Sequence, residues 1–253
     1  MVTDLLNKDS IQPRIFSLGQ AGFIFKNRNG EFLAIDPYLS DCVEQYEGHM
    51  GFKRLLPKII KPEDVNLDYI IATHKHLDHF DVDSIPTLMK HDHTHLYASA
   101  DCLELVKECG IDSNRVSYVK PGDDISSGNY KLHFVNCDHG ESAPDAVGVI
   151  IEMDGKLIYE TGDTCLRLDR VAEVLSFGPI DILIAPINGA YGNLNEEECA
   201  TLCDALKPKL VIPCHYGMFA SHGGDPGKFY EVMKKKQPKQ DILLMAQGEI
   251  LNL

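Results

Sequence analysis

The sequence predicts a single α/β domain over residues 1–253. Two observations support this fold class. Short apolar runs typical of strands alternate with amphipathic stretches typical of helices, an order that favours layers of helix and sheet. The composition, with 44% hydrophobic and 25% charged residues, is that of an ordinary globular protein. No internal repeat, low-complexity tract or linker rich in proline and serine divides the chain.

The first half of the chain is interpreted as strands with two short helices. The turn 27–30, Asn-Arg-Asn-Gly, separates two apolar runs and is a hairpin signal. The run 67–73 is short and rich in isoleucine, as expected for a buried strand. Gly110 is placed to end a helix. The expected strands are 15–18, 22–26, 32–35, 67–73, 96–99, 115–119 and 130–136, and the expected helices are 83–90 and 101–109.

The second half continues with hairpin and helix signals. Asp154-Gly155 marks a turn between two strands. Asn195 is expected to cap a helix, with Glu198 three residues on in a pattern like a capping box. Lysines 234–236 suit the C-terminal end of a helix, where cations are favoured. The expected strands are 146–153, 156–161, 180–185, 209–213 and 241–246, and the expected helices are 168–175, 196–206 and 227–236.

Charge and cysteine usage limit the partners and the compartment. The chain has 24 Lys and Arg against 38 Asp and Glu, a net charge of −14, which repels phosphate backbones, so we expect no nucleic-acid partner. No run approaches the roughly 20 apolar residues of a membrane helix, and no secretory signal is apparent, so we expect no membrane partner. The eight cysteines are scattered without a CxxC pair, which indicates reduced thiols and a cytoplasmic protein.

The strongest chemical signal is the segment 73–79, Thr-His-Lys-His-Leu-Asp-His, at the end of the expected strand 67–73. His74 and His76 lie two apart in an extended turn and can direct both imidazoles at one ion. Asp78 and His79 then fall on the far side, where a second ion could sit. Imidazole nitrogens and carboxylate oxygens are ligands that divalent metals prefer. Three histidines and an aspartate directly after a buried strand are unusual for a surface segment without a function.

Three more candidates follow strands farther along the chain. His139 comes after the strand 130–136, and Asp163 lies in Gly-Asp-Thr after another strand. His215 follows the strand 209–213. Any one of them alone would more often be a structural histidine or a turn aspartate. Two metals about 3.5–4 Å apart need ligands from several strands, and four such strand-end placements together favour a metal site.

These residues resemble the metallo-β-lactamase superfamily, and the resemblance covers the whole chain. It implies an αββα sandwich with the metal site at one edge of the two sheets. Asp36, in Ile-Asp-Pro, resembles the family's early aspartate and would brace the histidine loop, with a plain turn residue as the other interpretation. The implied ligands are His74, His76 and His139 for one ion, Asp78, His79 and His215 for the other, and Asp163 as the bridge.

Five further blocks resemble the L-ascorbate-6-phosphate lactonase branch: residues 18–23, 36–41, 162–164, 187–193 and 219–226. This resemblance implies that the chain opens the lactone ring of a phosphorylated sugar acid, a small anionic substrate, by attack of a metal-bound hydroxide. It also implies a homo-oligomer with Mn²⁺ as the metal. Zn²⁺ is the alternative on intrinsic affinity, and one or two ions per chain are compatible with the ligand set.

Two other functions are left open. The first is a phosphodiesterase or nuclease of the same superfamily, against which the acidic charge and the lack of a basic, aromatic-rich segment count. The second is a metal-binding protein without enzymatic activity. The presence of a complete ligand set of seven side chains favours an enzyme.

Catalytic and substrate-binding roles are assigned to named residues as expectations. Asp78 would orient the nucleophile and pass a proton to the leaving alkoxide, and with one ion Asp78 and His79 would act directly as acid and base. Arg54, in the loop after residue 41, could grip a phosphate with paired donors, or be a solvated loop cation. The further candidates for substrate contact are Asn188 and Tyr191 in a glycine-rich loop and Ser221, His222 and Asp225 in the loop after His215.

Overall fold

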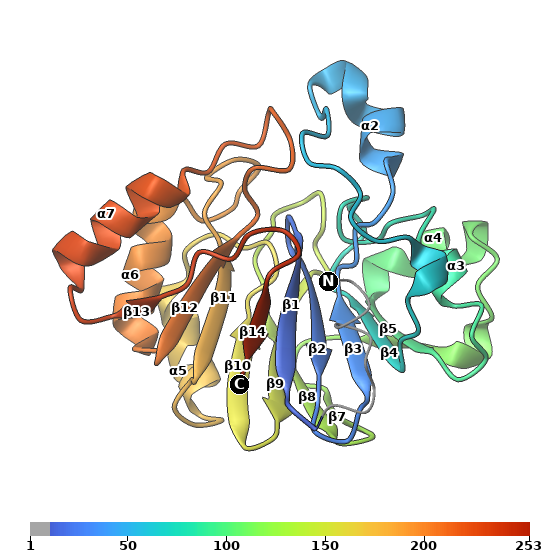
Figure 1. Ribbon diagram of the computed structural model, residues 1–253, viewed down its shortest axis with the longest axis horizontal. Helices are drawn as coiled ribbons and strands as arrows, with labels where there is room; N and C mark the ends of the chain where they lie inside the picture. Colours follow the sequence, from blue (N-terminus) through green and yellow to red (C-terminus); the bar gives the residue numbers. More distant parts are fainter. Residues whose placement is uncertain (1–10) are drawn as a thin grey trace.

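Two seven-stranded mixed sheets form the centre of the protein (Figure 1). The computed structural model describes residues 11–253. The first sheet has, in spatial order, β14 (Ile250–Asn252), β1 (Arg14–Gly19), β2 (Gly22–Lys26), β3 (Phe32–Ile35), β4 (Tyr69–Ala72), β5 (His95–Ser99) and β6 (Val116–Val119). The second has β13 (Asp241–Ile242), β12 (Leu210–Cys214), β11 (Ile182–Pro186), β10 (Lys156–Glu160), β9 (Val147–Met153), β8 (Tyr130–Asn136) and β7 (Asp124–Ser127).

The sheets pack face to face and helices cover both outer faces, which confirms the expected αββα sandwich. Buried side chains such as Phe25, Phe134 and Ile184 fill the space between the sheets. Figure 1 shows α3 and α4 on one outer side and α5, α6 and α7 on the other. Within residues 11–253, every helix is too short or too polar to pass through a bilayer. The helices are α2 (Cys42–Glu47), α3 (Ile85–Leu88), α4 (Leu103–Glu108), α5 (Val171–Leu175), α6 (Glu196–Leu206) and α7 (Pro226–Lys236).

The start of α6 follows the local pattern of the sequence. The side chain of Asn195 accepts hydrogen bonds from the amides of Glu197 and Glu198, and the Glu198 carboxylate accepts one from the Asn195 amide. This capping box satisfies amides that a helix otherwise leaves without partners. The helix therefore begins where the sequence predicts.

Other elements differ from the expectation. The helix expected at 83–90 is limited to α3, and the strand expected at 241–246 is limited to β13. The helix α2 and the strands β7 and β14 were not expected. The β7 sequence, Asp-Ile-Ser-Ser, is too polar to indicate a strand, and its pairing with β8 depends on tertiary contacts rather than local propensity.

The strand directions bring the candidate ligands to one edge of the sandwich. In the second sheet β10, β11 and β12 are parallel, and β8 points the same way because β8 and β10 both run antiparallel to β9. His139, Asp163 and His215 follow β8, β10 and β12, so they emerge on the same side. The histidine loop follows β4 of the first sheet, and the Val147 amide donates to the Thr73 carbonyl at 3.1 Å, which joins the two edges.

Tyr130 links the two sheets far from this edge, and its removal gives a test of the fold. Its fully buried hydroxyl lies 2.7 Å from the Glu31 carbonyl oxygen and accepts from the Asn27 amide at 3.1 Å. Tyr130→Phe should lower the free energy of unfolding by about 1–3 kcal/mol, because buried backbone groups lose a partner. Urea unfolding measures this. Tyr118→Phe, at an exposed position, should change it by less than about 0.5 kcal/mol, and equal effects would contradict the assignment.

Candidate metal centre

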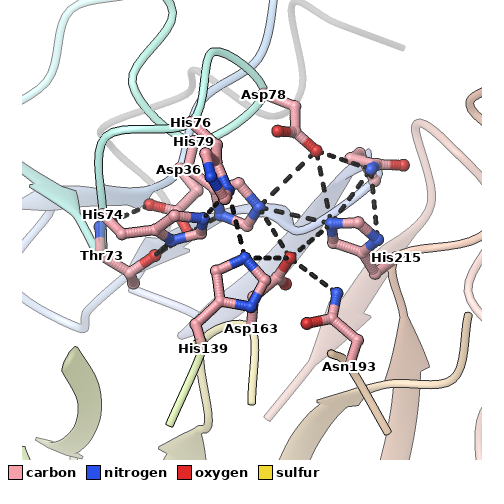
Figure 2. Close-up of polar contacts among 12 residues, drawn as sticks. Asp36, Thr73, His74, His76, Asp78, His79, His139, Asp163, Asn193 and His215 are labelled. Carbon is pink, nitrogen blue, oxygen red and sulfur yellow. Dashed lines mark hydrogen bonds and ion pairs between the residues drawn. The ribbon is translucent and has the colours of Figure 1, made fainter. Parts of the chain in front are cut away.

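The loop after β4 turns sharply and presents its histidines and aspartate to the sheet edge (Figure 2). The amides of His79 and Phe80 both donate to the His76 carbonyl, at 2.9 and 2.7 Å. This turn reverses the chain and returns the His79 ring to the His74 ring, with their centroids 3.9 Å apart. The side chains of His74 and His79 are fully buried.

His74, His76 and His139 form the first cluster, as the resemblance implied. His74 Nε2 lies 3.0 Å from His76 Nδ1, which lies 3.1 Å from His139 Nε2. The ligand atoms of all three lie within 4.8 Å of one another. Three imidazoles whose ring nitrogens converge at this distance are suited to a single divalent ion.

The second cluster lies beside Asp163, whose Oδ2 atom is the centre of the whole arrangement. This oxygen lies 2.9 Å from His215 Nε2, 3.4 Å from His79 Nε2 and 3.9 Å from His139 Nε2. Asp78 Oδ2 lies 3.3 Å from His215 Nε2. Two further sets of ligand atoms also fall within 4.8 Å of one another, His74 with His79 and Asp163, and Asp78 with His215 and His222.

The donor chemistry of these clusters fits one or two divalent cations. Two imidazole nitrogens that face each other at about 3 Å share at most one proton between them, so such close contacts need a cation or a proton to be favourable. Here this occurs between His74 and His76, between His76 and His139, and between His79 and His215, the last pair at 3.3 Å. Nitrogen and carboxylate ligands together suit Zn²⁺ and Mn²⁺.

Burial and the carboxylates set the protonation of these groups. Burial lowers the pKa of His74 well below its usual range and that of His139 to about 4. Burial also opposes protonation of His79, but nearby carboxylates, that of Asp163 most strongly, outweigh it and hold the His79 pKa well above its usual range. The pKa of Asp163 is well below its usual range, because His215 and His79 outweigh burial.

Asp36 braces the histidine loop from behind. Its carboxylate accepts from the Thr73 amide at 2.8 Å and from the Thr73 hydroxyl at 2.7 Å, and lies 2.6 Å from His79 Nδ1. It is fully buried and has a φ of +45°, an unfavourable conformation for a residue with a side chain. This contact fixes the orientation of the His79 ring, as in metal sites where a carboxylate holds a ligating histidine.

Two amide side chains at the site were not among the expected residues. Gln20, in the turn between β1 and β2, donates to Asp78 Oδ2 at 2.8 Å and lies 2.8 Å from His222 Nδ1. Asn193 donates to Asp163 Oδ2 at 2.7 Å. Gln20 lies in the block 18–23 and Asn193 in the block 187–193. Their position in these blocks was the one feature of the sequence that could have identified them, because a neutral amide side chain does not stand out in a pattern of charged residues.

A cavity of about 300 Å³ opens onto the two clusters. Its floor is formed by expected ligands and its walls by residues from the α2 region and the loop after β11. None of the residues that line it is lysine or arginine. The lining residues are Glu47, Met50, Phe52, His76, Asp78, His139, Ser142, Asp163, Tyr191, Asn193, His215 and His222.

Of the six residues expected to contact substrate, the structure brings Tyr191 and His222 to this cavity. The Arg54 side chain is 5% exposed and donates to the carbonyls of Ser40 and Leu56, at 2.5 and 2.8 Å, so its guanidinium supports a loop. This placement differs from both interpretations of Arg54, since the side chain neither lines the cavity nor is solvated.

The other three expected contacts also lie outside the lining. Asp225 caps α7 by accepting from the amides of Gly227 and Lys228, so its carboxylate has a structural partner. The Asn188 side chain donates to the Ala190 carbonyl at 3.4 Å within its own loop. Ser221 does not line the cavity either. The sequence blocks therefore identified the correct loops, but only two of the side chains predicted in them to contact substrate, Tyr191 and His222, line the cavity.

Comparisons with known proteins agree with this architecture. The chain is similar to a UPF0173 metal-dependent hydrolase of Thermococcus onnurineus, 29% identical over 196 residues that cover 76% of this chain and 85% of the relative. A UPF0173 metal-dependent hydrolase of Herpetosiphon aurantiacus is 27% identical over 242 residues, which cover 92% of this chain and 94% of the relative.

Solved structures share the fold at low sequence identity. Igni18, a metallo hydrolase of Ignicoccus hospitalis, matches with a TM-score of 0.73 at 21% identity, covering 96% of this chain and 98% of that one. The metallo-beta-lactamase fold protein YhfI of Bacillus subtilis matches with a TM-score of 0.70 at 14% identity, covering 95% and 99%. Residues 14–215, which include all seven expected ligands, match the family model described as beta-lactamase superfamily domain, and the chain therefore belongs to that family.

Proposed function

We propose that this chain is a metal-dependent hydrolase that opens the ring of a lactone. The observation that carries the proposal is the convergence of five histidines and two aspartates from four loops beside one cavity, with Asp163 Oδ2 at their centre. The family match and the similarity to proteins named metal-dependent hydrolases support the hydrolase class. The sequence blocks that resemble the lactonase branch support the lactone.

The ligand set assigns a role to each part of the site. His74, His76 and His139 would hold one ion, and Asp78, His79 and His215 a second, with Asp163 between them. A divalent ion held there supplies Lewis acidity, which activates water near neutral pH and polarises a carbonyl oxygen. We propose Mn²⁺, with Zn²⁺ as the alternative.

Asp78 is the side chain placed to move a proton. It lines the cavity, and Gln20 holds its Oδ2 atom at 2.8 Å. From there its carboxylate can orient the attacking water, take its proton and pass that proton to the alkoxide that leaves when the ring opens. His79 does not line the cavity and its Nδ1 faces Asp36, so we assign it a ligand role and no proton transfer.

Elemental analysis combined with turnover assays tests this function. Protein stripped by chelation and reloaded with Mn²⁺ or Zn²⁺ should bind one or two ions per chain and open γ-butyrolactone. L-ascorbate 6-phosphate is the phosphorylated test substrate, and bis(p-nitrophenyl) phosphate tests the phosphodiesterase alternative. Turnover of the phosphodiester without lactone opening would replace the proposal by that alternative. Failure to bind metal after reloading would overturn both.

A further inference from the structure

Three rings form one wall of the cavity above the candidate ligands. The Phe52 centroid lies 5.5 Å from that of Tyr191 and 5.2 Å from that of His222. Tyr191 and His222 are 5.5 Å apart. We call these three residues the aromatic wall. Phe52 also packs edge-on against the buried Phe219, so the wall is anchored to a small apolar cluster below it.

Two large side chains are exposed at the mouth of the cavity, one of them part of the aromatic wall. Met50 is 56% exposed and Tyr191 is 55% exposed, and both line the cavity. Tyr191 also has a φ of +55°, which is costly for a residue with a bulky side chain. Large exposed apolar groups around a concave site are typical of surface that a ligand covers.

The charge of the residues that line the cavity does not favour a phosphate near its mouth. No lysine or arginine lines it, and Glu47 adds a carboxyl group at the wall. Proteins hold phosphate mainly with guanidinium, ammonium or backbone amide donors. The guanidinium of Arg54 is already bound by backbone carbonyls outside the cavity. A phosphate that extends from the ligands towards the mouth would therefore meet rings and a carboxyl group.

We propose that the cavity selects a neutral lactone that carries an aryl group, and disfavours a phosphorylated one. The proposal rests on the proposed lactone hydrolysis, which places the reacting carbonyl at the floor near Asp78 and Asp163. The aryl substituent then packs against the aromatic wall, where ring pairs with centroids about 4.5–7 Å apart attract one another. A cavity of about 300 Å³ accommodates a lactone ring with one such substituent.

A matched pair of substrates tests the selection. γ-Phenyl-γ-butyrolactone and γ-(phosphonooxymethyl)-γ-butyrolactone share the same ring and the same secondary alkoxide leaving group. On metal-loaded protein, kcat/KM should be about tenfold or more higher for the phenyl compound than for unsubstituted γ-butyrolactone. The phosphorylated compound should fall below the unsubstituted one.

Two variants with a matched control connect the selection to the wall. Tyr191→Ala should reduce the preference for phenyl over the unsubstituted ring about fivefold. Tyr46→Ala removes a tyrosine of similar exposure, 60%, that does not line the cavity, and should leave the preference unchanged. Met50→Arg places a guanidinium at the mouth and should raise kcat/KM for the phosphorylated lactone.

The outcomes separate this inference from the proposed function. Equal turnover of the phenyl and unsubstituted lactones, or faster turnover of the phosphorylated one, overturns the inference and leaves lactone hydrolysis intact. If no lactone is opened, the proposed function fails, and the binding of ligands to the cavity then tests the inference. Calorimetry would then compare phenylacetohydroxamate with phosphonoacetohydroxamate on metal-loaded protein. Tighter binding of the phenyl compound that is lost in Tyr191→Ala supports the aryl site, and equal affinities overturn it.

Discussion

Replacing Asp163 with asparagine should remove most of the hydrolytic activity, lowering kcat/KM by on the order of 10³-fold, because several kcal/mol of metal-assisted stabilisation is lost. Asp163 Oδ2 is the atom nearest to all parts of the site, within 3.9 Å of ring nitrogens of His79, His139 and His215. Asparagine keeps the shape but removes the negative charge with which Asp163, in the proposed function, would help to hold the cations. The amide would also face the Asn193 amide, which now donates to this oxygen.

Metal content and steady-state kinetics, measured on the same preparation, check this expectation. Asp138→Asn is the matched control, since Asp138 directly precedes His139 in the chain but pairs with Arg167 at 2.6 Å on the surface. Loss of that half-exposed ion pair should lower the free energy of unfolding by at most about 1 kcal/mol and leave the metal content unchanged. Asp163→Asn protein that keeps wild-type metal content and activity within tenfold would contradict the bridging role.

The clustering of the candidate ligands could be predicted from the sequence because its signals are local. Each candidate ligand directly follows a strand, and the parallel direction of β8, β10 and β12 brings His139, Asp163 and His215 to one edge. The histidine loop follows β4 in the same manner. Apolar runs identify the strands, and the resemblance to the metallo-β-lactamase superfamily implies that their ends meet at one edge. The strand directions that bring them together are seen only in the structure.

The walls of the cavity could not be predicted in the same way. The sequence leaves Arg54 as either a phosphate-binding residue or a solvated loop cation, but its side chain donates to the carbonyls of Ser40 and Leu56, which the loop brings close only after folding. Phe52 lines the cavity because the chain after α2 pairs with the loop after β12, where Arg54 lies opposite Phe219. Such contacts join segments with no regular spacing, so neither periodicity nor residue type indicates them.

Residues in strained conformations also mark the site, and the sequence gives little sign of them. Within residues 11–253, six non-glycine residues have a positive φ. Four of them, Gln20, Asp36, Tyr191 and His215, contact the clusters or line the cavity. A backbone strained at one place and supported by its surroundings is typical of functional sites. Only the three-dimensional structure shows that these four positions, far apart in sequence, share this feature.

Asp36→Asn should weaken metal binding about 10–100-fold without removing any ligand. The carboxylate of Asp36 lies 2.6 Å from His79 Nδ1 and fixes Nε2 towards Asp163. An asparagine has a single oxygen, which cannot serve His79 and both donors of Thr73 as the two carboxylate oxygens do. His79 would then lose the acceptor that determines which ring nitrogen carries the proton, and its Nε2 lone pair would no longer be held ready for a cation.

Asp81→Asn distinguishes this effect from a general loss of stability. Asp81 is as deeply buried as Asp36 and accepts from the amides of Leu39, Ser40 and Ser84, but contacts no histidine of the site. Both variants lose hydrogen bonds to a charged group, each worth about 1.5–3 kcal/mol, and both should unfold at lower urea concentration. Competition with a chelator should show weaker metal binding in Asp36→Asn alone. Equal weakening in the two variants would mean that Asp36 acts through the stability of the fold, whereas a selective loss would show that a buried carboxylate prepares His79 to bind the metal.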